Sequence, residues 1–198
     1  FNALNISDRL SDYIHFEKRR PQGTENLYGL LHAIKNKVHI GFAYQKFWEG
    51  TITARVVEPY ALKEFRNRWY VLAKDLKDQK VKSFALDRLS ELEITNRKFH
   101  LPNTFNINDH FKYSFGIISP NGQKSQEVIL SFTPFQGKYI KTLPLNHSQE
   151  IITDNEEELV IKLTLFVTFD FLMEVLSYGD NVKVIQPESL VADVKNTC

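Results

Sequence analysis

The sequence is poor in cysteine: its single cysteine, Cys198, is the last residue, so no disulfide can form within the chain. A chain without disulfides suits a reducing compartment. The N-terminus carries no basic segment followed by an apolar run, and the longest apolar stretches, such as LVIKLTLFVTF, are interrupted and too short to span a bilayer. We therefore expect a cytoplasmic protein that is neither secreted nor embedded in a membrane.

The common catalytic signatures are also missing. The chain has no glycine-rich phosphate loop, no Gly-x-Ser-x-Gly elbow, no His-Glu-x-x-His and no Cys-x-x-Cys. Its six histidines are scattered singly, without the spacing of metal ligands. The acidic run of residues 156–158 is typical of a solvated hairpin turn. We expect no enzymatic activity, no cofactor and no metal site.

What the sequence does contain is a globular composition with uneven charge. Hydrophobic residues make up 42% of the 198 positions, and phenylalanine alone supplies 15, which excludes a disordered or fibrous chain. Basic residues outnumber acidic residues by 18 to 12 in residues 1–98, whereas residues 124–198 have 6 basic and 11 acidic side chains. The basic half is compatible with an anionic ligand or nucleic acid, but an excess of this size is more often a solvated surface.

Residues 24–98 read as one helix followed by short strands. Apolar residues at helical spacing after Thr24 predict an amphipathic helix with Thr24 as its N-cap. From Val38 to Thr95, runs rich in Val, Ile, Phe, Tyr and Trp alternate with turn-like pieces. Four or five strands without an intervening helix predict a small antiparallel barrel or a strongly curved sheet, with Pro59 at an edge or bend.

A second domain is expected after a linker over residues 99–123, which are rich in Pro, Gly and Asn and lack periodicity. Residues 124–198 show the order βαββαβ, with Asp170 as the N-cap of the second helix and Gly179 at its end. This order predicts a ferredoxin-like domain. The expected fold class is α+β, mainly β. The chain starts at Phe1, so residues 1–23 are interpreted as a linker from an upstream part.

The run VVEPYALKEFRNRWYVLAKDLKDQKVKSFALDRL resembles the WYL domain, which is named after a Trp-Tyr-Leu triplet. Here the triplet is Trp69-Tyr70-Val71. Further similarities are Pro59, Arg68 and the series Lys82, Phe84, Asp87, Arg88 and Leu89. Downstream, DFLMEVLSYGDNVKVIQPESLVADV resembles the WCX extension that often follows this domain. Order and spacing over residues 24 to 196 carry the resemblance.

The resemblance implies a Sm-like or SH3-like barrel for residues 24–98 and a WCX domain for residues 124–198. Such proteins are bacterial transcriptional regulators in which the barrel senses a ligand or nucleic acid behind an N-terminal helix-turn-helix domain, usually in a homodimer. The implied partners are a nucleotide-like or single-stranded nucleic-acid effector and DNA, the latter bound through an N-terminal domain outside this chain.

The resemblance also implies a ligand pocket. Its residues would be Tyr44, Arg68, Trp69, Tyr70, Lys82 and Arg88, with lysine at 82 where arginine is usual. Alternation along the strand predicts Trp69 and Val71 in the core and Tyr70 on the other face. Two alternatives stay open: Arg88 could form an ion pair with Asp87 or a neighbouring strand, and the chain could be a dimerisation module without a ligand.

Overall fold

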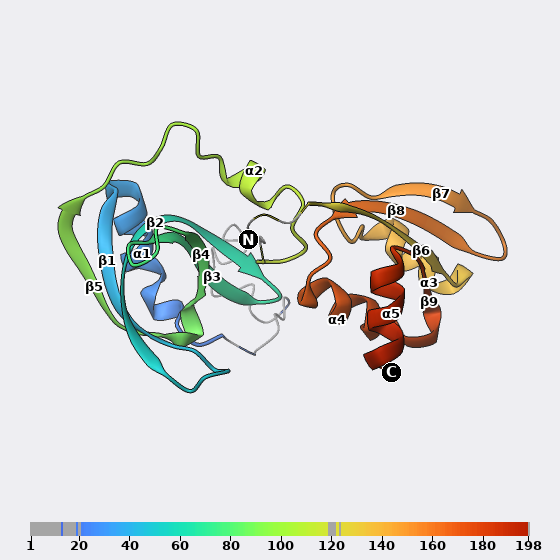
Figure 1. The fold of residues 1–198 in the computed structure, drawn as a ribbon, viewed down its shortest axis with the longest axis horizontal. Helices are drawn as coiled ribbons and strands as arrows, with labels where there is room; N and C mark the ends of the chain where they lie inside the picture. The colour runs from blue at the N-terminus through green and yellow to red at the C-terminus, as the bar shows by residue number, and fades with distance from the viewer. Residues whose placement is uncertain (1–12, 14–18, 20, 119–121, 123, 198) are drawn as a thin grey trace.

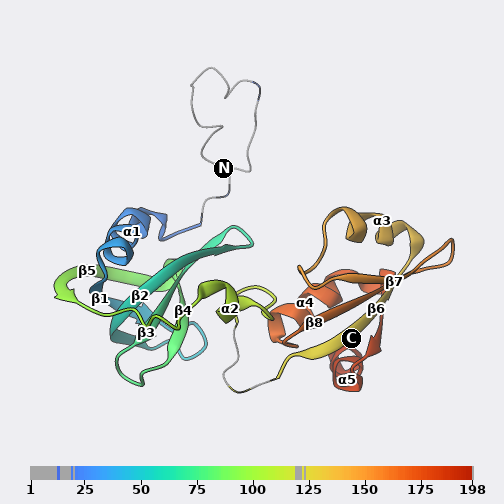
Figure 2. The same cartoon turned by 90° about the horizontal axis from the view of Figure 1, so that it is seen from above.

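The computed structural model describes residues 13, 19, 21–118, 122 and 124–197. Most of the linker expected over residues 1–23, like Cys198, lies outside them. The described chain forms two antiparallel sheets, one at each end of the long axis, with a short helix, α2 (Ile107–Phe111), between them (Figure 1, Figure 2). The coarse expectation of a mixed α+β fold made mostly of strands is confirmed.

The described residues of the N-terminal half form one helix and five strands with two 3-10 turns. Its elements are η2 (Thr24–Asn26), α1 (Leu27–Asn36), β1 (Val38–Gln45), β2 (Ile52–Phe65), β3 (Arg68–Asp75), β4 (Val81–Ala85), η3 (Leu86–Arg88) and β5 (Leu89–Lys98). The sheet order is β4-β3-β2-β1-β5. Among the described residues no ladder joins β4 to β5, so hydrogen bonding does not close this sheet into a barrel.

The long strand β2 carries an irregularity at its middle. The register between β2 and β3 shifts between Pro59 and Ala61, as expected where a proline cannot donate a ladder hydrogen bond. The predicted bend at Pro59 is therefore present, although β2 lies inside the sheet and not at its edge.

Side chains from α1 and from one face of the sheet form the first core. Leu30, Ala33, Ile40, Val71 and Leu86 have no exposed surface there. The predicted N-cap at Thr24 is wrong, because Thr24 lies in a 3-10 turn and α1 starts three residues later. The hydroxyl of Thr24 donates to the carbonyl oxygen of Pro21 (3.5 Å) and does not cap a helix. At the preceding Gly23, φ is 84° and a Cβ would come 2.1 Å from the carbonyl oxygen of Leu86, so the close approach requires glycine.

The C-terminal half contains β6 (Gln126–Phe132), α3 (Pro134–Thr142), β7 (Glu150–Asp154), β8 (Leu159–Leu165), α4 (Phe169–Ser177), η4 (Gly179–Asn181), β9 (Val182–Gln186) and α5 (Glu188–Thr197). Its sheet order is β7-β8-β6-β9. Inward-facing residues of β6 and β8 pack with Ile140, Phe171, Val175 and Leu190 from the three helices. None of the helices described is long and apolar enough to cross a membrane.

The ends of α4 differ in how well the sequence predicted them. Thr168, and not Asp170, is the N-cap residue, and Asp170 lies within the first turn. Gly179 follows the helix with φ of 53°, as expected for a glycine that ends a helix in the left-handed conformation.

The tip of the β2–β3 hairpin connects the two halves. Phe65, the last residue of β2, packs against the core of the C-terminal half, and its ring lies 5.8 Å from that of Phe115. Arg66, the next residue, forms an ion pair with Glu174 of α4. The loop before β6 closes over Phe65, since a Cβ on Gly116 would come 2.7 Å from the Phe65 ring. Hence the loop before β6 and helix α4 both hold the hairpin tip.

Candidate functional site

A two-residue turn places several cations at this hairpin tip. Arg66 and Asn67 both have positive φ angles, 50° and 61°, the conformation that two-residue hairpin turns require. Asn67 stabilises the turn, because its backbone N–H donates to Oε1 of Glu64 (2.6 Å) and its Nδ2 donates to the carbonyl oxygen of Arg19 (3.1 Å). Arg66 therefore lies in a tightly held turn, and Arg68 directly follows it.

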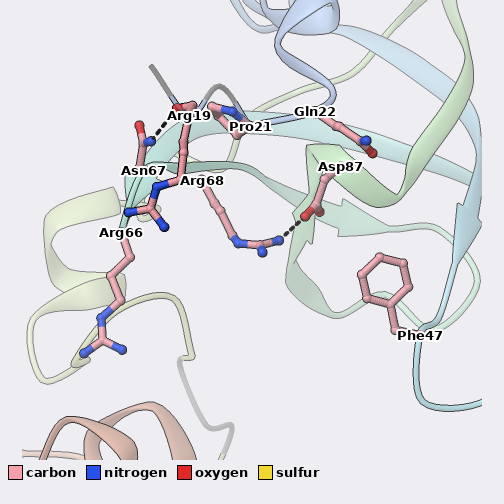
Figure 3. Close-up of a pocket in the computed structure, with 8 residues that line it drawn as sticks. All are labelled: Arg19, Pro21, Gln22, Phe47, Arg66, Asn67, Arg68 and Asp87. Atoms are coloured by element: carbon pink, nitrogen blue, oxygen red, sulfur yellow. Dashed lines mark hydrogen bonds and ion pairs between the residues drawn. The ribbon is translucent and has the colours of Figure 1, made fainter. Parts of the chain in front are cut away.

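These arginines line a cleft of about 450 Å³ (Figure 3). The described lining residues are Arg19, Pro21, Gln22, Phe47, Arg66, Asn67, Arg68 and Asp87. Arg68 pairs with Asp87, whereas the Arg66 side chain extends away from Asp87 (Figure 3) and pairs with Glu174 of α4. Since a guanidinium presents a fork of N–H donors that matches phosphate and carboxylate oxygens, the cleft favours an anionic ligand. We refer to it as the arginine cleft.

Asp87 positions Arg68 in the arginine cleft. Nη1 of Arg68 is ion-paired with Oδ2 of Asp87 (Figure 3). The Asp87 side chain is only 12% exposed, whereas that of Arg68 is 56% exposed. The buried Asp87 carboxylate therefore fixes one end of the Arg68 guanidinium, and the rest of the guanidinium remains open to solvent.

Arg88 lies beside the cleft and contacts an aromatic ring at its rim. The Arg88 guanidinium lies 4.4 Å from the centroid of the Phe47 ring, within the range of a cation–π contact. Its Nε is 3.9 Å from Oδ1 of Asp87, so the ion pair weighed as an alternative for Arg88 is present but long. Sequence reasoning missed Phe47; the only signal was an aromatic pair, Phe47-Trp48, in a loop between two strands.

Of the six residues predicted from the resemblance, Arg68 lines the cleft and Arg88 adjoins it. Tyr70 is 9% exposed, on the face of β3 opposite Val71. Burial raises the pKa of its hydroxyl, and Arg68 opposes this shift while Asp87 adds to it. The Tyr70 hydroxyl is therefore within the electrostatic influence of these two charges.

The other two aromatic residues of the predicted pocket belong to the first sheet. Trp69 is partly buried against the core, and Val71 is fully buried in it, which agrees with the expected alternation. The hydroxyl of Tyr44 accepts a hydrogen bond from the N–H of Ala85 (3.3 Å), and its ring packs edge-on against Phe84 at 5.2 Å.

Lys82 is engaged elsewhere. Its Nζ lies 2.9 Å from Oδ2 of Asp75 and 2.6 Å from Oδ2 of Asp78. Lys82 pairs with Ala73 in the β3–β4 ladder, whereas Tyr70 pairs with Ala85, so Lys82 is about 10 Å further along the strands. The structure brings Arg68 and Arg88 together around Asp87 and does not bring Lys82 to them.

Asp75 is the centre of this second charge cluster. Its side chain is 1% exposed, and Nη1 of Arg55 lies 2.9 Å from its Oδ2. Burial would raise the pKa of Asp75, but hydrogen bonds from Nζ of Lys82 and the N–H of Lys77 outweigh burial and lower it. Asp75 is therefore a carboxylate that neutralises two cations.

The geometry supports anion binding and stacking. The arginine cleft offers guanidinium donors for phosphate oxygens, and Phe47 offers a ring face for a base. In the described part of the chain no three His, Cys, Asp or Glu side chains are grouped so as to hold a metal ion.

Comparison with known proteins bears on the identity of both halves. Residues 25–94 match the model of the WYL domain, and residues 124–198 match that of the WCX domain. No curated protein matched the chain.

Two solved structures are similar. The "Proteasome accessory factor B/C (PafBC) of Arthrobacter aurescens" is 20% identical with a TM-score of 0.39, over 95% of this chain and 28% of that one. A structure described as a "CRISPR Cas-related protein" is 12% identical with a TM-score of 0.53, over 88% of this chain and 50% of that one. The second likeness supports the fold alone, and this chain spans half or less of either protein. The two family matches, in this order along one chain, place the protein in the WYL domain family with a C-terminal WCX domain.

Proposed function

We propose that this chain is the effector-binding part of a transcriptional regulator and that the arginine cleft binds a nucleotide-like or single-stranded nucleic-acid effector. WYL and WCX domains support a regulatory sensing role. The observation that carries the choice of ligand is the gathering of Arg19, Arg66 and Arg68 in one cleft with Phe47 at its rim. Ligand binding would control a DNA-binding domain located N-terminally of this chain. The chain would bind its effector without catalysing a reaction.

Within the proposed site, Arg68 is the main anion-binding group of the predicted set, Arg88 adjoins it through Phe47, and Arg66 is an addition to that set. Arg66 also contacts α4 through Glu174. A phosphate bound by Arg66 would compete with this carboxylate and so weaken the contact between the hairpin tip and the C-terminal half. Ligand binding and the arrangement of the two halves would be coupled by this competition.

Tyr44, Trp69 and Tyr70 are proposed to support the strands that carry the site, and Lys82 acts further away. Tyr44 fixes the start of η3 through its hydrogen bond with Ala85. Tyr70 is buried in β3, two residues after Arg68. Lys82 stabilises the far end of β4 through Asp75.

The proposal includes a finer description of the architecture. We assign residues 24–98 to a Sm-like barrel, 99–123 to a linker that contains α2, and 124–198 to a ferredoxin-like domain. The element order β6-α3-β7-β8-α4-β9 supports the last assignment. The protein would act in the cytoplasm.

A binding titration tests the function. Fluorescence anisotropy of labelled single-stranded oligonucleotides, with unlabelled nucleotides as competitors, is measured at low salt for the wild type and for Arg68→Ala. Loss of one charged hydrogen-bonding group costs about 1.5–3 kcal/mol, or roughly 10- to 150-fold in affinity. The matched control is Arg97→Ala, which removes an exposed arginine from β5 of the same sheet. Equal affinities of wild type and Arg68→Ala would refute the proposed site.

A second candidate function, dimerisation without a ligand, is favoured by one edge of the second sheet. β7 is an edge strand, and its Ile151 and Ile152 are 51% and 53% exposed. An edge strand with exposed apolar residues can pair with another chain. We propose that homodimers form through this edge. Light scattering of the wild type and of Ile151→Lys tests it: a dimer that becomes a monomer supports the edge, and an unchanged mass rules it out.

A further inference from the structure

A second cleft, of about 680 Å³, lies between β2 and the short helix α2. Three separate parts of the chain contribute to its wall: Lys63 of β2, Phe111 and Lys112 at the end of α2, and His147 in the loop between α3 and β7. Its described lining residues do not overlap with those of the arginine cleft. We refer to it as the lysine cleft.

Strand alternation brings Lys63 into this cleft. The preceding residue, Leu62, packs on the first core together with Val71, its partner in the β2–β3 ladder. Because neighbouring side chains of a strand point to opposite faces, Lys63 faces away from that core. Its Nζ donates to the carbonyl oxygen of Gly116 (2.5 Å) and lies 3.6 Å from the centroid of the Phe111 ring. The ammonium group is therefore held in a fixed position.

Both of these partners of Lys63 are neutral. Among the residues that the structure describes, no carboxylate lies within ion-pair distance of its Nζ, whereas Asp75 neutralises Arg55 and Lys82. Burial lowers the pKa of Lys63, and no acidic side chain opposes this shift. A partly buried charge without a counter-charge is unfavourable. An anion that enters the cleft would supply the missing charge.

The charges around the cleft favour an anion that carries a single charge. Lys63 and Lys112 are the basic lysines of its wall, and Asp109 is its acidic residue. A phosphate monoester carries close to two negative charges at neutral pH and would be repelled by Asp109. A carboxylate carries one charge and needs only one strong donor, which the compact ammonium group of a lysine provides.

The rest of the wall is suited to an apolar group. Leu62, Ile107 and Phe111 contribute hydrocarbon and ring surface. Sites for small molecules are typically clefts of about 300–1,000 Å³ with mostly apolar walls and a few polar groups that orient the ligand. The size and the composition of the lysine cleft both agree with this description.

We propose that the lysine cleft binds a small monocarboxylate with an apolar body, such as an aromatic acid. The carboxylate accepts a hydrogen bond from Nζ of Lys63, and the body packs on Ile107 and Phe111. A bound ligand touches β2 of the N-terminal half, α2 of the linker and the His147 loop of the C-terminal half, so it favours the arrangement in which these three parts meet. The site does not depend on the proposed function of the arginine cleft.

The test compares three probes that share one ring. Isothermal titration calorimetry of the full chain at neutral pH and low salt measures the affinities of benzoate, of neutral benzamide and of phenyl phosphate. Benzoate should bind most tightly. Benzamide should bind about 10- to 150-fold more weakly, and Lys63→Gln should reduce the benzoate affinity by the same factor, the range for one lost charged hydrogen bond.

Two variants serve as matched controls. Arg68→Ala removes a cation of the arginine cleft, and Lys138→Gln removes an exposed lysine of α3 that does not line the lysine cleft. Both should leave the benzoate affinity unchanged. Benzoate should also raise the melting temperature of the wild type and of both controls, but not that of Lys63→Gln, whose own unfolding transition shows that the variant is folded.

Each contrary result overturns a stated part of the proposal. If the wild type does not bind benzoate, or binds benzamide equally well, recognition of a carboxylate is wrong. If Arg68→Ala weakens benzoate and Lys63→Gln does not, the anion binds in the arginine cleft instead. If phenyl phosphate binds more tightly than benzoate and depends on Lys63, the preference for a single charge is refuted.

Discussion

Replacing Asp75 by asparagine should destabilise the N-terminal half without removing any residue of the arginine cleft. Asp75 is fully buried, and its Oδ2 lies 2.9 Å from both Nη1 of Arg55 and Nζ of Lys82. The Arg55 side chain is 11% exposed, so it cannot easily turn to water when its partner is neutralised. Breaking a buried ion pair from one side typically costs about 3–5 kcal/mol.

Lys82 limits this loss because it has a second partner. Its side chain is 33% exposed and also contacts Asp78, which is 40% exposed. An exposed pair of this kind contributes little to stability, because solvent screens it. Asp78→Asn is therefore the matched control. Asp75→Asn should lower the free energy of unfolding by about 3 kcal/mol or more, and Asp78→Asn should lower it far less.

Urea unfolding followed by tryptophan fluorescence measures the difference. The unfolding midpoint of Asp75→Asn should fall by about 1–2 M. Because the pKa of Asp75 is lowered in the folded protein, its stabilising contribution is complete above the ordinary carboxyl pKa and is lost as the pH falls through the lowered value. Wild type and variant should thus converge in acid. A loss under 1 kcal/mol, or a gap that does not close in acid, would contradict the role of Asp75.

Three further predictions follow from the junction of the two halves. Gly116→Ala should lower the free energy of unfolding by about 1–3 kcal/mol, since φ at this position is 78° and the new Cβ would meet the Phe65 ring at 2.7 Å. Gly122→Ala, at a similar φ but with open space around it, should lower it less, and thermal unfolding of both variants measures the difference. Burial raises the pKa of Asp170 despite the nearby Arg66, so Asp170→Asn should increase the free energy of unfolding at pH 7. This gain should vanish as the pH falls below the ordinary carboxyl range. A variant that is less stable than the wild type at every pH would contradict this prediction. Arg66 and Glu174 should show a coupling of about 0.5–1 kcal/mol in a double-mutant cycle of unfolding, and saturating ligand should reduce it; coupling unaffected by ligand would argue against competition for Arg66.

Much of the local structure could be predicted because short-range sequence patterns determine most strands and helices. Alternation of large apolar residues around Trp69 and Val71 predicted a strand there and placed Val71 inward. The helix caps were harder. Thr24 and Asp170 are both good capping residues by type, but Thr24 lies in a 3-10 turn and Thr168 occupies the N-cap position of α4.

The candidate site shows where prediction from sequence stops. Arg68 and Arg88 could be named from the resemblance, and they do meet around Asp87. Lys82 satisfied the same pattern, yet it pairs with Asp75 because of the β3–β4 register. Phe47 was not foreseen, since its place at the cleft depends on how the β1–β2 loop folds beside η3.

The sequence by itself predicted most of the strands and helices and the family, because periodicity, turn residues and motif order are properties of neighbouring positions, but it did not predict α2 or α5. Only the tertiary structure decided which cations share a site and which neutralise buried carboxylates. It also decided that Arg66 reaches both the cleft and Glu174. The physical reason is that charge pairing and burial depend on distances between segments far apart in the chain, which strand register and hairpin packing set.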